Sequence, residues 1–212
     1  MTNYYILMGD IVSSRKYRQG ELNQTFAHLV SHCNEEMASG ILSPYTITLG
    51  DEFQGIAKSL RSAVESIFCF EETCLRKLLT FNVRFVLVYG GIDTPINEKI
   101  AYGMMGPGLS KARGLLTDKK RGTSRFLFDL PDNTLSLQLT RIFSVLESVV
   151  EEWHKKDFPL IVDMLANENN KEVGNKYGKD RSQIWKRRKS LRISEYEILK
   201  QVIFDLINDR EY

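Results

Sequence analysis

The sequence predicts an α+β protein in which strands alternate with helices first and only helices follow. Short apolar runs of strand length alternate with longer segments whose apolar residues recur at helical spacing. The turn signal Pro-Asp-Asn-Thr closes the last strand-like run at residues 131–134. Beyond this turn every apolar pattern has the helical period. We therefore expect an N-terminal domain over residues 1–132 and an all-α C-terminal domain over residues 133–212.

The strands are expected where short apolar runs stop at glycine or other turn residues. The strongest run, Val-Arg-Phe-Val-Leu-Val-Tyr, stops at Gly90-Gly91, and an earlier run stops at Gly50-Asp51 and turns back as a hairpin. The five expected strands lie at residues 4–12, 44–49, 53–57, 83–89 and 125–130.

The helices are expected where apolar residues recur every three to four positions. Those between the strands lie at residues 21–37, 60–79 and 109–116, which gives the order β-α-β-β-α-β-α-β. Those after the turn lie at residues 135–153, 158–166 and 195–207, with two short helices beginning near Lys171 and Ser182.

The composition is that of an ordinary soluble protein, with 42% hydrophobic and 26% charged residues among 212. No apolar run approaches the roughly 20 residues of a membrane-spanning helix, and the N-terminus lacks the basic region and cleavage site of a signal peptide. The three cysteines, Cys33, Cys69 and Cys74, form no C-x-x-C pair and are expected to be reduced. These features predict a cytoplasmic protein without a membrane partner.

Acidic residues stand at the ends of strands that are expected to be neighbours. Asp10 lies near the end of the first strand, and Asp51 lies in the hairpin. Mg²⁺ is usually held by one or two carboxylates together with water and phosphate oxygens. A suitable phosphate cradle of backbone N–H groups, hydroxyls and a guanidinium follows the first acid. It consists of Ile11, Val12, Ser13, Ser14 and Arg15. On this pattern alone, acids that face water in a turn are an equally good alternative.

The motifs Gly-Asp-Ile-Val-Ser-Ser-Arg and Thr-Leu-Gly-Asp-Glu-Phe-Gln-Gly resemble the two metal-binding motifs of class III nucleotide cyclase catalytic domains. The second is also similar to the Gly-Gly-Asp-Glu-Phe signature of diguanylate cyclases. The stretches VRFVLVYGG and YGMMGPGLSKARGL resemble the cyclase segments that follow. The whole chain resembles the SatD family, bacterial proteins that join such a region to a C-terminal helix-turn-helix. The resemblance implies a ferredoxin-like, palm-like sheet in the N-terminal domain.

The resemblance also implies roles for single residues. Asp10 and Asp51 fall on ligand positions for Mg²⁺ or Mn²⁺, and Glu52 matches the acid that follows the metal ligand in diguanylate cyclases. The cyclase asparagine and arginine positions are Ser110 and Gly114 here.

Ser110 is therefore an expected nucleotide-binding residue, while Arg113 stands one position early, a rotation of about 100° on a helix. That rotation predicts a different direction for Arg113, and Lys111 or Arg15 could replace it. Lys111 and Arg113 are the candidate catalytic residues.

Residues 170–188 suit a helix-turn-helix, with Gly178 in the turn and Asp180 or Ser182 as the cap of the second helix. The stretch from residue 171 to residue 192 contains nine Lys or Arg and two acids, so its formal net charge is +7. The chain as a whole has a net charge of +2, so the remaining residues sum to −5. The residues expected to face base edges are Arg181, Ser182, Gln183 and Lys186, and those expected to meet phosphates are Arg187, Arg188 and Lys189. A protein-binding module is the alternative.

Three functions fit these patterns. The first is a DNA-binding regulatory protein whose cyclase-like domain binds a nucleoside triphosphate or related nucleotide with a divalent metal as effector. The alternative is an active Mg²⁺-dependent nucleotide cyclase or nucleotidyltransferase tethered to DNA, and the second alternative is a degenerate palm domain that serves as a dimerisation scaffold. Helix-turn-helix proteins commonly bind DNA as two-fold dimers, and cyclase sites lie between two palm domains. A homodimer is therefore expected, with the helix at 135–153 as a candidate interface.

Overall fold

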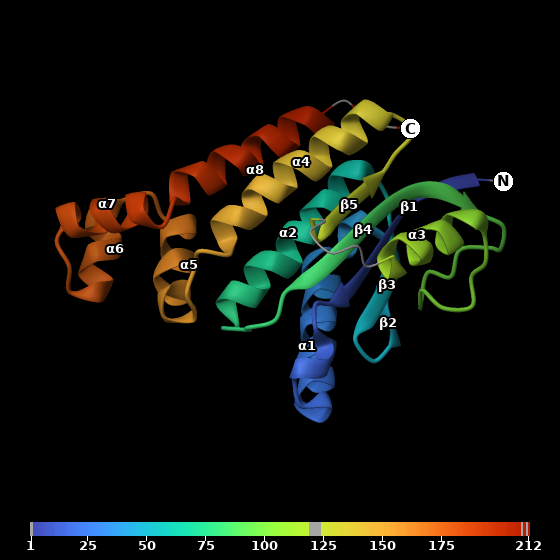
Figure 1. The fold of residues 1–212 in the computed structure, drawn as a ribbon, viewed down its shortest axis with the longest axis horizontal. Coiled ribbons are helices and arrows are strands. Elements are labelled where there is room, and N and C mark those ends of the chain that lie inside the picture. Colours follow the sequence, from blue (N-terminus) through green and yellow to red (C-terminus); the bar gives the residue numbers. More distant parts are fainter. Residues whose placement is uncertain (1, 119–123, 209, 211) are drawn as a thin grey trace.

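The computed structural model describes residues 2–118, 124–208, 210 and 212, and they form one five-stranded sheet with helices on both faces (Figure 1). The strands are β1 (Thr2–Ile11), β2 (Ile41–Leu49), β3 (Glu52–Ala57), β4 (Val83–Ile92) and β5 (Phe126–Asp129). The helices between them are α1 (Gln19–Glu36), α2 (Leu60–Arg76) and α3 (Pro107–Thr117). The expected order β-α-β-β-α-β-α-β is confirmed.

The strands lie in the order β2-β3-β1-β4-β5. The central strand β1 pairs antiparallel with β3 and with β4, and β5 is parallel to β4. A β-α-β-β-α-β unit with its first strand between the third and the fourth is the ferredoxin-like arrangement. The N-terminal part therefore has the mixed α+β sheet of a palm-like fold.

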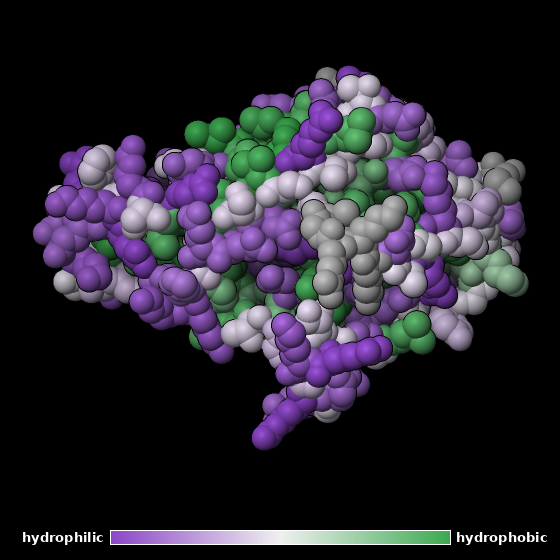
Figure 2. Space-filling view, viewed as in Figure 1, coloured by the Kyte–Doolittle hydropathy of each residue, from purple (hydrophilic) through white to green (hydrophobic). Residues whose placement is uncertain are grey.

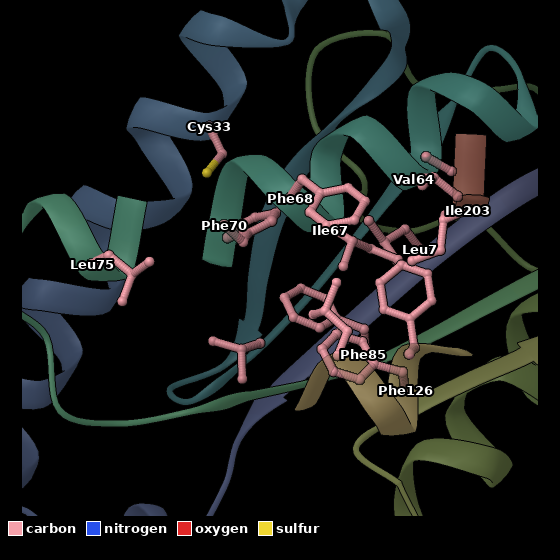
Figure 3. Close-up of a cluster of buried hydrophobic side chains, with 14 of the residues drawn as sticks. Leu7, Cys33, Val64, Ile67, Phe68, Phe70, Leu75, Phe85, Phe126 and Ile203 are labelled. Carbon is pink, nitrogen blue, oxygen red and sulfur yellow. The ribbon is translucent and has the colours of Figure 1, made fainter. Parts of the chain in front are cut away.

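The two faces of the sheet carry different side chains because residues along a strand alternate. Tyr5 and Leu7 of β1 belong to the larger buried cluster, which α1 and α2 cover. Figure 3 shows Leu7, Phe85 and Phe126 within this cluster, opposite the aromatic side chains of α2. Ile6 and Met8 belong to a smaller cluster beneath α3. Asp10, two positions after Met8, therefore lies on the α3 face.

Five helices complete the described chain: α4 (Asn133–Val150), α5 (Phe158–Ala166), α6 (Asn170–Tyr177), α7 (Arg181–Ser190) and α8 (Ile193–Ile207). Asp132 caps α4 by accepting hydrogen bonds from the backbone N–H groups of Thr134 and Leu135. Helices α4 and α8 lie side by side, and α6 and α7 form the far end of the molecule (Figure 1). The larger buried cluster extends from Tyr5 to Ile207, so these helices share their core with the sheet.

Two details differ from the sequence-based expectations. Helix α4 ends at Val150, three residues before Trp153, because Trp153 turns inward and its indole N–H donates to the Leu191 carbonyl at 2.7 Å. The apolar periodicity of residues 195–207 also predicts that Ile198 belongs to the core of the C-terminal helices, but its side chain is 56% exposed on α8. Over the described residues, no helix is both long and apolar enough to cross a bilayer.

Candidate functional site

Three charged side chains form a row across the α3 face of the sheet. The strand register places Asp10 of β1 directly opposite Glu52 of β3 on one side and Arg84 of β4 on the other. Side chains of directly opposed residues lie on the same face. The Arg84 guanidinium lies 3.6 Å from the Asp10 carboxylate and also donates to the Leu116 carbonyl of α3 at 3.3 Å. Asp10 is only 7% exposed, so this charge is largely shielded from water.

Arg113 reaches this row from α3. Its Nη2 lies 3.3 Å from Oε1 of Glu52 and donates to Oε1 of Gln54 at 3.2 Å. The Thr48 hydroxyl donates to the same Glu52 oxygen at 3.1 Å. Despite its one-residue offset from the cyclase position, Arg113 therefore points at the acidic end of β3. The two carboxylates of the row each face one guanidinium.

A cavity of about 360 Å³ adjoins Arg113 on the α3 face. Its walls include the apolar side chains of Met8 and Met104 and the polar side chains of Gln54 and Ser110. At its mouth, Tyr102 and Met105 are 64% and 68% exposed. This combination of apolar walls and a few polar groups suits a planar heterocycle better than an ion.

The hairpin residue Asp51 lies beside the row. Its backbone carbonyl accepts a hydrogen bond from the Ile11 N–H at 3.0 Å, and its side chain is half-buried at the turn. Gly50, at φ +40°, forms the tight turn that brings the acids to the strand end. The register places Glu52, not Asp51, opposite Asp10.

The expected phosphate cradle is only partly open. The Ile11 and Val12 N–H groups donate to the carbonyls of Asp51 and Asn82, at 3.0 and 2.8 Å. These two amides hold the sheet edge together, so the expectation that they bind phosphate is wrong. The segment after them turns outward, with Ser13 in the left-handed region at φ 57° and Arg15 exposed.

The other basic candidate, Lys111, is directed elsewhere. Its ammonium group lies 2.8 Å from the Asp129 carboxylate of β5, so it pairs with the neighbouring strand in place of the acidic row. Ser110, one residue earlier, lines the cavity and is exposed.

Sequence reasoning missed Arg84 and Gln54. Arg84 is the one charged residue in the apolar strand Val83–Ile92, and that exception was the available signal. The side chain of Gln54 is only 6% exposed. Its amide oxygen accepts a hydrogen bond from Arg113, and its amide nitrogen donates to the Ala101 carbonyl. Its role depends on the register, which the sequence does not display.

The donor set limits the kind of metal that fits. Among the residues that the structure describes, no group of three or more His, Cys, Asp or Glu side chains could hold a metal ion. Asp10 and Glu52 offer two carboxylates on adjacent strands, and Mg²⁺ that shares phosphate oxygens needs only one or two from the protein. The acidic row therefore fits a cation that arrives with a phosphorylated ligand, and not one held by protein side chains alone.

At the far end of the molecule, α6 and α7 pack against each other across a three-residue turn. Gly178 has φ +61°, and a Cβ on Gly174 would lie 2.4 Å from the Lys179 carbonyl oxygen, so both glycines are required by the turn. Asp180 and Gln183 form a capping box at the start of α7. The Gln183 side chain is thereby engaged with the Asp180 backbone.

The basic surface of α6 and α7 is smaller than the charge count indicates. Arg188, expected at phosphates, is 8% exposed and donates to the carbonyls of Met164 and Asn167, so that expectation is wrong. Arg187 pairs with buried Asp157 at 2.6 Å. Lys176 and Arg192 also pair with acids. The exposed basic residues of this stretch without an ion pair to any described residue are Lys171, Lys179, Arg181, Lys186 and Lys189. Figure 2 shows this end of the molecule covered mainly by hydrophilic side chains.

Comparison with known proteins gives one family and two similar structures. Residues 4–207 match the profile of the SatD family. A bacterial light-regulated adenylyl cyclase is 14% identical, with 60% of this chain and 75% of that chain covered and a TM-score of 0.42. The catalytic core of a rhodopsin-guanylyl cyclase with converted specificity, in complex with ATPalphaS, is 15% identical, with 56% and 73% covered and a TM-score of 0.36. Both TM-scores are below 0.5, so neither likeness assigns an activity. No curated protein matches the chain significantly.

Proposed function

This chain belongs to the SatD family, and we propose that its α3 face binds a nucleoside triphosphate or related nucleotide together with Mg²⁺ or Mn²⁺. In this proposal the nucleotide is the effector of a DNA-binding function of α6 and α7. The supporting observation is the row Arg84–Asp10–Glu52, closed by Arg113 and adjoined by the cavity. Two carboxylates, two guanidiniums and an apolar cavity are the groups that a metal–phosphate–base ligand requires.

Each part of the ligand has a counterpart on this face. Asp10 and Glu52 would hold the cation, which supplies positive charge to the phosphates, and Asp51 lies beside them in the hairpin. Arg113, released from Glu52, would donate to phosphate oxygens, and a guanidinium suits this because its donors match them in pairs. Gln54 and Ser110 would donate to or accept from the base. Ser13, Ser14 and Arg15 extend outward from the same strand end and offer further phosphate contacts.

Effector binding is favoured over turnover by two observations on α3. Phosphoryl transfer depends on groups positioned to stabilise the charge that develops on the transferred and leaving oxygens. Lys111 is engaged by Asp129, and Gly114, at the position that resembles the cyclase arginine, has no side chain to contribute. The alternative, a nucleotide cyclase or nucleotidyltransferase, is favoured by one observation, that Arg113 lies against the acidic row.

Calorimetric titration with the four nucleoside triphosphates in the presence of Mg²⁺ tests the proposal. We expect saturable binding of at least one of them, weakened about tenfold or more by Asp10→Asn and by Glu52→Gln. Glu65→Gln is the matched control, because Glu65 pairs with Arg61 on α2, on the opposite face of the sheet. Absence of binding for all four nucleotides would contradict the proposal and favour the dimerisation scaffold. Release of pyrophosphate by the wild type, lost in Asp10→Asn, would favour the enzyme.

The proposed DNA-binding function depends on the exposed side chains of α7. Its exposed residues Arg181, Ser182 and Lys186 lie at and after the helix start, where recognition helices contact base edges, and Lys189 lies one turn further. Trp185 is 52% exposed between them and is not part of the core. A homodimer would present two such helices to a two-fold DNA site. Light scattering of the chain with and without duplex DNA measures both the oligomeric state and the complex.

A further inference from the structure

Two of the three cysteines lie close together on neighbouring helices behind the sheet. Cys33 of α1 and Cys69 of α2 have their Sγ atoms 3.4 Å apart. Cys33 is fully buried, whereas Cys69 is partly exposed. A disulfide requires an S–S distance of about 2.05 Å, so the two sulfurs need to approach by only about 1.4 Å. We propose that Cys33 and Cys69 form a reversible disulfide when the protein meets a peroxide.

The surroundings of the pair give the two cysteines different roles in the reaction with peroxide. The hydrogen bond between the two thiols lowers the pKa of Cys69 more than burial raises it, and Thr73 and Arg76 lower it further. The same interaction and burial raise the pKa of Cys33. Because the thiolate is the nucleophile, Cys69 is the sulfur that reacts with peroxide, and it is also the one that solvent reaches. Cys33 is then the resolving thiol.

The steps balance with hydrogen peroxide as the oxidant. The Cys69 thiolate attacks one peroxide oxygen, the O–O bond breaks and hydroxide leaves, which gives a sulfenic acid. The Cys33 sulfur attacks the Cys69 sulfur, the S–O bond breaks, and the departing hydroxide takes the Cys33 proton. The hydroxide of the first step takes up the proton that Cys69 released on ionising, so two thiols and one peroxide become one disulfide and two waters. A dithiol reductant reverses the reaction by exchange.

The position of the bridge gives it a structural effect. The segment between Cys33 and Cys69 contains β2, the hairpin and β3, and therefore Asp51 and Glu52. Next to Cys33, Asn34 already holds the Tyr45 backbone of β2 by two hydrogen bonds of 2.8 Å. A bridge would close this loop covalently behind the acidic row and constrain the unfolded chain. The oxidised form is therefore expected to have the higher Tm.

Peroxide treatment of the folded full-length chain, followed by alkylation and peptide mapping, tests this proposal. Free thiols should fall from three to one per chain, the linked peptide should join Cys33 to Cys69, and dithiothreitol should restore all three. The matched control is Cys74→Ser, because burial raises the pKa of the Cys74 thiol and no bridge is assigned to it. In this variant the thiols should fall from two to none, with the same linked peptide.

Cys69→Ser provides the complementary measurement, and its folding is checked by circular dichroism. It should keep both remaining thiols under the peroxide dose that oxidises the wild type, and its Tm should no longer change on oxidation. Linkage of Cys74 to either partner, linkage between chains, or equal loss of all three thiols would each overturn the proposal.

Discussion

Arg113 of α3 and Glu52 of β3 form an ion pair, with Nη2 and Oε1 3.3 Å apart, at the edge of the α3-face cavity. The arginine side chain is 49% exposed and the glutamate side chain 13%. Solvent-exposed ion pairs contribute only about 0.2–1 kcal/mol, and the arginine of this pair is half-exposed, so a phosphate group can compete with Glu52 for the guanidinium. The exchange would leave the Glu52 carboxylate available to a cation as the phosphates arrive.

Arg113→Ala should therefore change the affinities for nucleotide and for free metal in opposite directions. The loss of a charged donor to phosphate should weaken nucleotide binding about tenfold, equivalent to about 1.4 kcal/mol. The loss of the positive charge beside Glu52 should strengthen the weak binding of Mn²⁺ that two carboxylates alone allow in the absence of nucleotide. Calorimetry measures the first effect, and electron paramagnetic resonance of free Mn²⁺ measures the second.

Lys111→Ala is the control for this prediction because Lys111 lies on the same helix and has the same charge, but pairs with Asp129. It should change nucleotide affinity by less than about twofold, or roughly 0.4 kcal/mol. If Lys111→Ala weakens binding as much as Arg113→Ala does, the effect belongs to the overall charge of α3 and not to the Arg113–Glu52 pair.

Helix α3 can hold Arg113 in place because two glycines let it approach the sheet. A Cβ on Gly108 would lie 2.7 Å from the backbone carbonyl carbon of Gly90 on β4. Gly108→Ala should therefore displace α3, destabilise the protein by about 1–3 kcal/mol, and weaken nucleotide binding. Urea unfolding measures the loss of stability.

Gly114→Ala on the same helix is the matched substitution. No atom lies within 4 Å of a Cβ built at Gly114, and alanine is the better helix former by about 1 kcal/mol. This variant should be equal to or more stable than the wild type. If Gly114→Ala destabilises the protein as much as Gly108→Ala does, the loss cannot be assigned to the contact between Gly108 and Gly90.

The sequence predicted the elements and the acidic residues, but not how charges meet around them. Strand and helix order follow from local periodicity, and the sequence shows Asp10 directly after Gly9 and Glu52 two residues after the turn glycine Gly50. Arg84 pairs with Asp10 only through the register of β1 and β4, and Arg113 meets Glu52 only through the rotation of α3 on the sheet. Both relationships are tertiary, so periodicity cannot reveal them.

The basic stretch shows the same limit at the other end of the molecule. The number of charged residues can be counted in the sequence, but the sequence does not show which of them are buried. Arg188 looks equivalent to Lys189 in a run of cations, yet it fills a position where the carbonyls at the end of α5 need donors. The helix-turn-helix pattern located the glycines of the turn but could not separate structural arginines from exposed ones.

Arg188→Leu should consequently destabilise the protein rather than weaken an interface. It would leave the carbonyls of Met164 and Asn167 without their donor, at a cost of about 1–3 kcal/mol for each buried group. Chemical denaturation measures this loss. A variant as stable as the wild type would contradict the structural role of Arg188.

Lys189→Ala should behave in the opposite way, with unchanged stability and weaker DNA binding. If Lys189 contacts a phosphate, the slope of log K against log salt should become less negative by about 1. Fluorescence anisotropy with duplex DNA over a range of salt concentrations measures this slope. The exposed Lys155, which precedes α5 and lies outside α6 and α7, provides a control substitution with the same loss of charge. An identical change in slope for Lys155→Ala would contradict a specific role for α7.

Glu197 of α8 gives a prediction that depends on pH. Burial in the groove between α2, α5 and α8 raises the pKa of its carboxyl, and the nearby Glu168 raises it further against the opposing effect of Arg188. A raised folded-state pKa means that the native protein binds the proton more tightly than the unfolded chain does, so ionisation of Glu197 at neutral pH reduces stability.

Glu197→Gln should therefore raise the Tm at pH 7. The gain should shrink as the pH falls through the folded-state pKa and vanish below the ordinary glutamate value of about 4.3, where both states are protonated. Glu195→Gln, at an exposed position in the first turn of α8, should leave the Tm unchanged or lower it slightly, because an acid there favours the helix N-terminus. Calorimetric melting of the three proteins between pH 3 and 8 measures both effects, and a gain for Glu197→Gln that persists at pH 3 would show that removal of the charge is not its cause.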